Sequence, residues 1–262
     1  LLVKLFLNMK IKFLKKIIII RFIKRKFAHK ILSSEQYDTN TKAYDGKYER
    51  GYALNYPDGH VIRINEHVLK YELGLKGGKI LDFGCGVGQH LEYFAKNGYT
   101  PYGCDVVERS IKQCKAIMPE FSENFHVNES IPNLKDHFNE EFDLIFSNQT
   151  LYYLNDKDIN NLLSQFDNML KPGGVFVATM ISPKNYMNNP ILPSTVERFE
   201  GGLTKCSLRG RVNDTTYVNF KTKEEMVKLF DRFKKIQVGW YSQITREQEG
   251  QTDHFIFIGQ KK

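Results

Sequence analysis

The sequence predicts an α/β fold in which helices cover both faces of a mostly parallel sheet. Between residues 79 and 181, short apolar runs typical of buried strands alternate with amphipathic segments typical of helices. A glycine turn, GCGVG at 84–88, joins the first of these strands to a helix, and an LKPGG turn at 170–174 leads from a helix back into the sheet. Strands separated by helices run parallel, so these observations favour a sheet buried on both faces.

The elements of this alternation follow in chain order. A helix at 61–73 ends at Gly74 and precedes the strand KILDF at 79–83. The next elements are expected to be a helix at 89–98, a strand at 100–105, a helix at 108–118, strands at 124–128 and 141–148, a helix at 156–170 with Asp156 as its N-cap, and a strand at 175–181.

The alternation breaks at 182–220, where prolines and a Gly-Gly pair predict an irregular insertion. A helix at 222–233 then begins with Thr222 and Glu225 in capping-box spacing. The last two strands, at 234–248 and 254–262, have no helix between them, so we expect them to pair antiparallel.

Residues 1–60 are expected to form a basic arm and a tyrosine-rich flap ahead of the main domain at 61–262. Of the 38 Lys and Arg residues, ten lie in residues 1–30, which contain no acidic residue; the other 28 accompany 30 acidic residues. The longest apolar run of the arm, at 17–20, is far shorter than the roughly 20 residues that span a bilayer. The arm is either a basic amphipathic helix on an anionic membrane surface or a loosely attached tail.

The rest of the composition narrows the class of function. The near-neutral body does not indicate a broad nucleic-acid-binding face. The four cysteines have no paired spacing, so we expect neither a metal site nor disulfides. The expected compartment is therefore a reducing cytoplasm. Within it, the basic arm is a candidate contact to the inner membrane surface.

The glycine turn admits three kinds of ligand. Gly84, Gly86 and Gly88 lie where the backbone can approach a ligand closely. A nicotinamide-binding turn favours GxGxxG, but residue 89 is Gln, and the Gly-Lys-Ser/Thr end of a P-loop is absent. The third reading is a pocket for S-adenosylmethionine (SAM), which has no pyrophosphate.

Two further features lie in register with the turn. Asp105 ends the second predicted strand, 21 residues after Gly84, where a carboxylate can accept hydrogen bonds from ribose hydroxyls. Ser147, Asn148 and Gln149 end the fourth strand, at the edge of an open α/β sheet where ligands bind.

The motifs ILDFGCGVG, YGCD, FDLIFSNQTLYYL and LKPGGVFVATM together resemble those of the class I SAM-dependent methyltransferases of small-molecule type. The resemblance covers residues 79–181, and the closing helix and hairpin extend it. It implies a Rossmann-like sheet of seven strands in the order 3-2-1-4-5-7-6, with the last strand antiparallel; ahead of this sheet, the pattern of the basic arm predicts an N-terminal helical extension. It also implies SAM as cofactor and S-adenosylhomocysteine as product.

Site residues follow from the resemblance by position. It implies cofactor contacts from Asp82, Gly84, Cys85, Gly86, Gly88, Asp105, Val106, Asn148 and Gln149, and a contact to the adenine for which Asn128, Glu129 and Ser130 are open alternatives. Where many relatives carry a histidine after the fourth strand, this chain has Tyr153.

Methyl transfer from a sulfonium depends mainly on alignment and exclusion of water, and it needs a base only when the acceptor must lose a proton. The candidates for that base are Tyr153, His126, His137, Asp253 and His254. Tyr153 and His254 are the preferred catalytic residues, His254 because the closing hairpin borders the acceptor side in the family.

Acceptor recognition is expected from the flap at 44–60 and the insertion at 182–220. Lys205, Arg209 and Arg211 in the insertion could hold a phosphate or carboxylate of the acceptor. The abundance of Lys, Asn, Ile and Phe indicates a bacterial origin, and we expect O-methylation of an envelope or capsule saccharide precursor. The alternatives are an RNA methyltransferase that uses the basic arm, a SAM-binding protein without catalysis and, least favoured, a nicotinamide oxidoreductase.

Overall fold

A computed structural model describes residues 34–262 except 130, 189–194, 209–213, 246 and 248–249. The chain divides into two compact units between Thr39 and Asn40. The described part of the first unit, residues 34–39, is helical. The basic arm lies outside the described residues.

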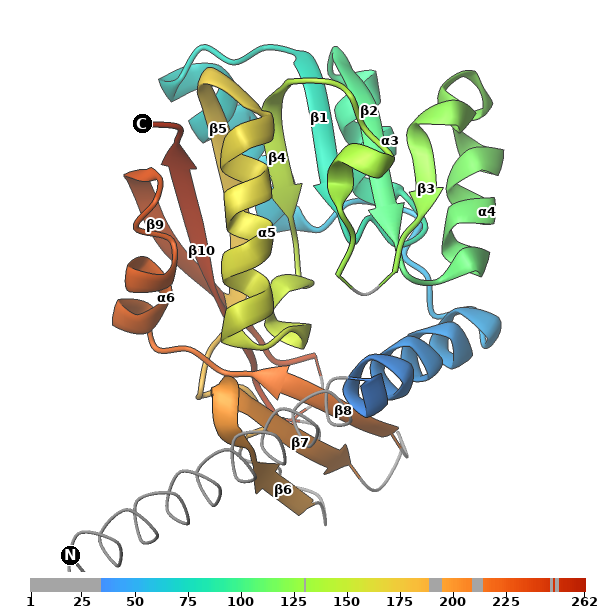
Figure 1. Ribbon diagram of the computed structural model, residues 1–262, viewed down its shortest axis with the longest axis vertical. Coiled ribbons are helices and arrows are strands. Elements are labelled where there is room, and N and C mark those ends of the chain that lie inside the picture. Colours follow the sequence, from blue (N-terminus) through green and yellow to red (C-terminus); the bar gives the residue numbers. More distant parts are fainter. Residues whose placement is uncertain (1–33, 130, 189–194, 209–213, 246, 248–249) are drawn as a thin grey trace, which may run out of the picture. The chain divides into compact units, whose positions relative to one another are not determined.

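The second unit is built on a seven-stranded sheet with the order β3-β2-β1-β4-β5-β10-β9 (Figure 1). The parallel strands are β1 (Gly78–Phe83), β2 (Tyr99–Asp105), β3 (Phe125–Val127), β4 (Phe142–Ser147) and β5 (Leu170–Ile181). The last strand, β10 (Thr252–Gln260), pairs antiparallel with both β5 and β9 (Lys234–Gln243). The expected strand order and the closing hairpin are therefore confirmed.

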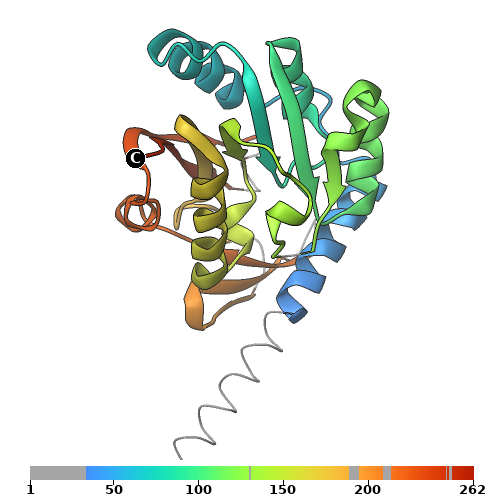
Figure 2. The ribbon, with the colours of Figure 1, turned by 45° about the horizontal axis from the view of Figure 1, so that its top comes forward.

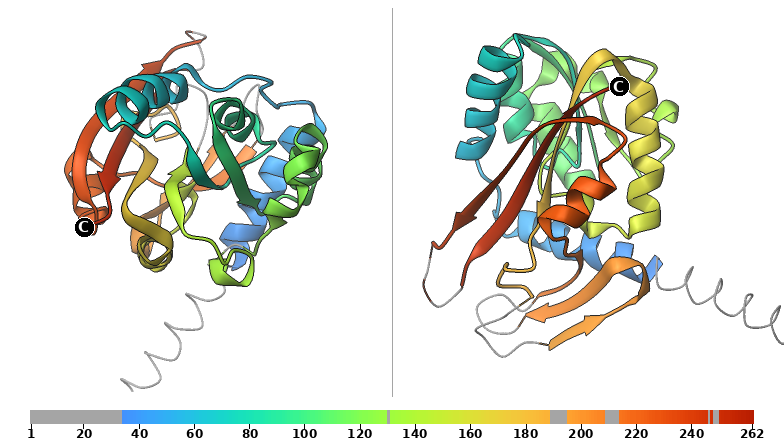
Figure 3. Two further views of the ribbon diagram at one scale, coloured as in Figure 1. Left: turned by 90° about the horizontal axis from the view of Figure 1, so that it is seen from above. Right: turned by 90° about the vertical axis from the view of Figure 1, so that its left-hand side faces the viewer.

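Helices cover both faces of this sheet (Figure 3). One face packs against α2 (Gly59–Arg63), the π-helix η1 (Ile64–Glu72), α3 (Gln89–Lys96) and α4 (Glu108–Ile117), whose apolar side chains share a core with β1, β4 and β5. The other face packs against α5 (Asp156–Met169) and α6 (Lys223–Leu229). Aromatic rings fill this second core; for example, Phe176 of β5 stacks on Phe233 with centroids 4.6 Å apart.

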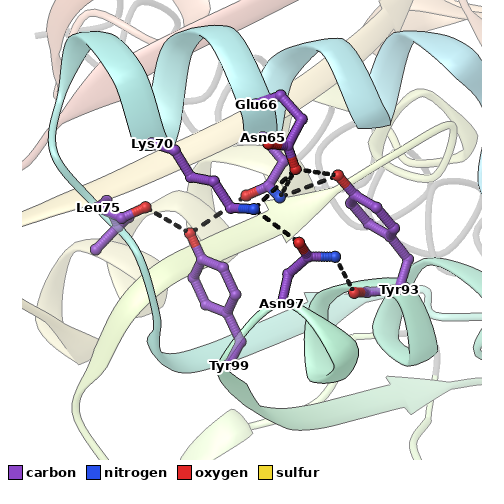
Figure 4. A network of polar contacts seen from close by, with 7 residues as sticks. All are labelled: Asn65, Glu66, Lys70, Leu75, Tyr93, Asn97 and Tyr99. Atoms are coloured by element: carbon purple, nitrogen blue, oxygen red, sulfur yellow. Dashed lines mark hydrogen bonds and ion pairs between the residues drawn. The ribbon is translucent and has the colours of Figure 1, made fainter.

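A polar network fixes η1 against α3 (Figure 4). Asn65 donates a hydrogen bond to the Tyr93 hydroxyl at 3.0 Å, and that hydroxyl donates to Glu66 at 2.9 Å. Lys70 donates to Glu66 and to Asn97, at 2.8 and 2.7 Å. Because η1 continues directly from α2, the network connects this continuous helical segment to α3.

The structure corrects the sequence prediction in three places. The described part of the insertion is not irregular throughout: it contains an antiparallel sheet of β6 (Thr195–Arg198), β7 (Leu203–Leu208) and β8 (Asp214–Asn219). Residues 34–49 are helical, where the end of the basic arm and the start of the tyrosine-rich flap were expected. The N-cap of α5 is Asn155 rather than Asp156, since the Asn155 side chain accepts a hydrogen bond from the backbone N–H of Asp158 at 3.0 Å. The capping box of α6, formed by Thr222 and Glu225, is confirmed.

Helical residues 40–49 and the small sheet lie at the carboxyl ends of the parallel strands (Figures 1 and 2). This is the edge at which an open α/β sheet binds its ligands. Among the residues that the structure describes, every helix is too short or too polar to cross a membrane.

Candidate active site

The site begins at the turn between β1 and α3. Gly84, Gly86 and Gly88 all have positive φ angles, of 81°, 54° and 87°. At Gly84 a β-carbon would lie 2.2 Å from the Thr150 side chain, and at Gly86 it would lie 2.9 Å from the hydroxyl of Tyr48. Glycine is therefore required both by the backbone conformation and by the close approach of neighbouring groups.

The Asp105 carboxylate holds this turn from β2. It accepts hydrogen bonds from the backbone N–H groups of Gly86, at 3.0 Å, and Val107, at 2.8 Å. Burial raises the pKa of the Asp105 carboxyl, while these backbone hydrogen bonds act in the opposite direction. The acid expected at the end of the second strand thus lies beside the glycine turn.

Two neighbouring side chains have unpaired acceptor atoms. Asp82 is buried, and neither of its carboxylate oxygens has a hydrogen-bond partner among the described residues. Burial, and secondly the nearby Asp105 charge, raise the pKa of Asp82 well above its ordinary value. Asn128 follows β3, and its backbone N–H donates to the Asp105 carbonyl at 3.0 Å; its side-chain oxygen is also buried without a partner in the described chain.

These acceptor atoms fit the cofactor that the motifs predict. An ionised carboxylate can only accept hydrogen bonds, and burying it without a partner is costly, which is the main reason that the pKa of Asp82 is raised. The ammonium group, ribose hydroxyls and adenine amino group of SAM are all donors. Asp82 lies in β1, Asp105 ends β2 and Asn128 directly follows β3, and these strands are neighbours, so the three residues can serve one extended ligand along the edge of the sheet.

Asn148 and Gln149 lie at the expected edge, but their side chains have protein partners. The Asn148 side-chain oxygen is 3.0 Å from the His60 ring nitrogen Nε2 and accepts from Thr179 at 3.2 Å. Gln149 has a positive φ of 55°, donates its backbone N–H to the Thr179 hydroxyl at 2.7 Å, and donates from Nε2 to the Tyr241 hydroxyl at 2.9 Å. Their predicted cofactor contacts therefore stay predictions.

Three stacked rings extend the site toward β9 and β10. The His60 ring stacks on Tyr241 with centroids 3.9 Å apart, and Tyr241 stacks on His254 at 5.0 Å. Burial lowers the pKa of His254 to about 4 and lowers the pKa of His60, while it raises the pKa of Tyr241. All three rings are therefore uncharged at neutral pH. The buried His254 Nδ1 has no hydrogen-bond partner among the described residues.

Tyr153 lies in a second aromatic group, next to this stack. Its hydroxyl is hydrogen-bonded to that of Tyr44, and its ring is 4.6 Å from the ring of Tyr152. Tyr152 in turn lies 5.6 Å from the His254 ring, so the two preferred catalytic residues belong to one cluster. Burial raises the pKa of Tyr44, Tyr152 and Tyr153 well above the ordinary value, and their phenols keep their protons at neutral pH.

The other sequence candidates lie elsewhere. His126 and His137 stack on each other, 5.1 Å apart, near β3 and so at the opposite end of the sheet order from β9 and β10. Asp253 accepts a hydrogen bond from Gln251 at 3.2 Å. Cys85 is buried and the pKa of its thiol is raised, with the neighbouring Cys114 as the first cause.

The cationic group predicted in the insertion is described only in part. Lys205 lies on β7, and its ammonium is 5.4 Å from the centre of the Tyr217 ring. Arg209 and Arg211 lie outside the described residues.

Several residues of the cluster were not singled out by sequence reasoning. Asp58 and His60 were included only as part of the flap, and neither His90 nor Tyr241 was identified. Asp58 lies 3.4 Å from His90 Nε2 and accepts from Asn148 at 3.4 Å. No motif marks these residues, because only the folded sheet brings α2, α3 and β9 to the end of β4.

Comparison with known proteins agrees with this geometry. Residues 81–176 match a family model described as a methyltransferase domain. An uncharacterized methyltransferase of Synechocystis sp. is 30% identical over 126 residues, which make up 47% of this chain and 57% of that protein. The chain thus spans less than two thirds of this relative.

Two solved structures show the same fold over most of the chain. The 1,6-didemethyltoxoflavin-N1-methyltransferase of Burkholderia thailandensis, solved with S-adenosylhomocysteine bound, is 18% identical with a TM-score of 0.59, covering 89% of this chain and 90% of that one. A SAM-dependent methyltransferase of Clostridium acetobutylicum is 16% identical with a TM-score of 0.57, covering 90% and 98%.

Proposed function

We propose that this protein transfers a methyl group from SAM to a hydroxyl of a small-molecule acceptor, because residues 81–176 match a methyltransferase-domain model and the sheet has the class I strand order. The observation that carries the proposal is the row of acceptor groups Asp82, Asp105 and Asn128 beside the glycine turn, in which the Asp82 carboxylate and the Asn128 side-chain oxygen have no hydrogen-bond partner among the described residues. We assign Asp82 to the ammonium of the cofactor, Asp105 to its ribose and Asn128 to its adenine. When bound there, SAM supplies an electrophilic methyl group.

The protein's own residues supply alignment, water exclusion and proton handling. The stack of His60, Tyr241 and His254 and the tyrosine group around Tyr153 form a mostly buried aromatic surface beyond the end of β4. His254 is uncharged at neutral pH, and its Nδ1 has no hydrogen-bond partner in the described part of the chain, so we propose that it accepts the proton of the acceptor hydroxyl. Tyr153 keeps its proton, so its proposed role is to donate a hydrogen bond that orients the acceptor rather than to act as the base.

We further propose a saccharide precursor of the bacterial envelope as the acceptor. Flat aromatic faces with phenol and imidazole edges suit a polyhydroxylated ring, which has apolar C–H faces and hydroxyl edges. Among the described residues, the Lys47 ammonium lies 4.5 Å from the centre of the Tyr44 ring, but Asp214 pairs with this charge at 3.1 Å, so we propose that the reacting part of the acceptor is uncharged. A phosphate or carboxylate at its other end remains our proposal for the insertion that carries Lys205, and membrane contact remains our proposal for the basic arm.

The first test is calorimetry of SAM and S-adenosylhomocysteine with the wild type and with Asp105→Ala. We expect micromolar binding to the wild type and a large loss in the variant. Methyl transfer is then measured with labelled SAM against sugar nucleotides, lipid-linked saccharides and RNA. Labelled sugars would support the acceptor assignment, and labelled RNA would replace it. Binding with no turnover in any fraction of a bacterial extract would instead indicate a non-catalytic SAM-binding protein.

A further inference from the structure

Residue Asn40 completes the outer edge of the insertion sheet. The side chain, only 7% exposed, accepts a hydrogen bond from the backbone N–H of Tyr217 at 2.8 Å and donates one to the carbonyl of the same residue at 3.1 Å. The Asn40 amide thus satisfies both backbone groups of one β8 residue, as a neighbouring strand would. A longer contact of 3.5 Å reaches the Tyr153 carbonyl.

Three more contacts hold the two ends of β8. Lys47, from the same helical segment as Asn40, forms a 3.1 Å ion pair with Asp214, and both side chains are mostly buried, at 16% and 13% exposure. At the other end of β8, Asn219 donates to the Leu154 carbonyl at 3.1 Å and to Asp156 at 2.8 Å. The insertion is therefore attached both to residues 40–49 and to the loop that carries Tyr153.

Because of the helical spacing, the contacts of Asn40 also fix the positions of two tyrosines in the site. Asn40, Tyr44 and Tyr48 are four residues apart, so they lie on one face of the helix. Tyr44 is hydrogen-bonded to Tyr153, and the Tyr48 hydroxyl lies against Gly86 in the glycine turn. A shift of the helix at Asn40 would move both tyrosines away from their partners.

We propose that Asn40 is a positioning residue that joins residues 40–49 and the sheet β6–β7–β8 into one lid over the cofactor site. The inference rests on the proposed function and assigns the insertion a second task. Besides recognising the acceptor, the insertion holds Tyr48 at the glycine turn and Tyr44 at Tyr153. Cofactor affinity then depends on contacts of β8 that touch no cofactor atom.

The binding test compares SAM affinity by calorimetry in the wild type, Asn40→Ala, Lys47→Ala and a control, Lys42→Ala, which changes an exposed residue of the same helix. If loss of the Asn40 contacts reduces the fraction of molecules with the lid in its binding position to about one tenth, the Kd for SAM rises about tenfold. We expect Lys47→Ala to change in the same direction by a smaller factor, and Lys42→Ala to match the wild type.

Hydrogen exchange distinguishes the proposed positioning role of Asn40 from a purely structural one. In the wild type, adding SAM should slow amide exchange in residues 40–49 and 214–219 together, whereas in Asn40→Ala the protection of 214–219 should be lost. The inference is overturned if Asn40→Ala binds SAM as the wild type does, or if SAM protects the helix but leaves β8 unchanged. Should Asn40→Ala fail to fold, Lys47→Ala and Asn40→Asp decide by the same two measurements.

The two proposals fail in different ways. A folded wild type that does not bind SAM removes the proposed function and this inference with it. A wild type that binds SAM, with an unchanged Asn40→Ala affinity, removes this inference alone.

Discussion

The carboxylate of Asp105 accepts a hydrogen bond from the backbone N–H of Gly86 at 3.0 Å. This contact ties the end of β2 to the middle of the turn after β1, before any ligand binds. A second hydrogen bond, from the Val107 N–H at 2.8 Å, fixes the orientation of the carboxylate. The site therefore has a preorganised acidic group, which reduces the ordering cost of binding.

Replacing Asp105 should weaken cofactor binding strongly. Asp105→Ala removes both the charge and the support of the turn, and we expect the Kd for SAM to rise at least tenfold, about 1.4 kcal/mol. Asp105→Asn keeps one acceptor oxygen and should have a smaller effect. Calorimetry checks both, with Asp136→Asn as an exposed control. Equal affinity in Asp105→Ala and the wild type would place the cofactor elsewhere.

A side chain at Gly86 should disturb Tyr48. Gly86→Ala puts a methyl group 2.9 Å from the Tyr48 hydroxyl and requires a φ of 54°, which costs about 1 kcal/mol for a residue with a β-carbon. We expect weaker SAM binding and partial recovery in the double variant Gly86→Ala/Tyr48→Ala. Gly59→Ala is the matched control, because its β-carbon would meet nothing within 4 Å. Strictly additive effects of the two changes would exclude the contact.

Acid should destabilise the fold through His254. Burial lowers its pKa to about 4 from the ordinary 6.5, so between these pH values the unfolded chain binds a proton that the native protein does not. Stability is therefore lost as the pH falls from 6.5 toward 4, by roughly 3 kcal/mol from this group. Urea unfolding between pH 4.5 and 7.5 measures the slope.

Replacing His254 measures how much this residue contributes to the pH dependence of the free energy of unfolding. His254→Phe should show a shallower dependence of the free energy of unfolding on pH, whereas His67→Gln, an exposed control, should keep the wild-type slope. A slope unchanged in His254→Phe would mean that other groups, such as His60, account for the acid sensitivity.

The hydroxyl of Tyr153 should affect turnover more than cofactor affinity. Tyr153→Phe removes the proposed donor to the acceptor, and we expect kcat to fall about tenfold or more with little change in the Kd for SAM. Tyr44→Phe removes the partner of Tyr153 and should have a weaker effect in the same direction. Tyr71→Phe, at a site 88% exposed, should be silent. A loss confined to SAM binding would assign Tyr153 to the cofactor side.

The main sheet could be predicted because its signals are local. Buried strands such as 142–147 are continuous apolar runs, and the glycine turn at 84–88 is marked by residue type alone. The chain order of these elements, together with the family resemblance, then gave the strand order.

Other features depend on contacts between distant segments. The strands β7 and β8 contain many Thr, Ser and Lys residues, and part of their stabilisation comes from Asn40 and Leu154 rather than from an apolar pattern of their own. Likewise, Asn148 turns toward His60, a partner 88 residues earlier, which nothing in its own motif indicates. The position of Asn155 as N-cap was missed because Asp156 is an equally good capping residue by type.

The place of β10 in the sheet has a consequence for synthesis. This strand follows β9 in the chain but lies between β5 and β9. Until residues 252–260 leave the ribosome, the outer edge of β5 is unpaired and β9 has no partner in the sheet. A nascent chain paused before this point would expose an apolar strand edge, VFVATMI, that is prone to pair with other chains. Ribosome stalling in this interval should therefore make the protein dependent on chaperones, even though most of its helices have already been made.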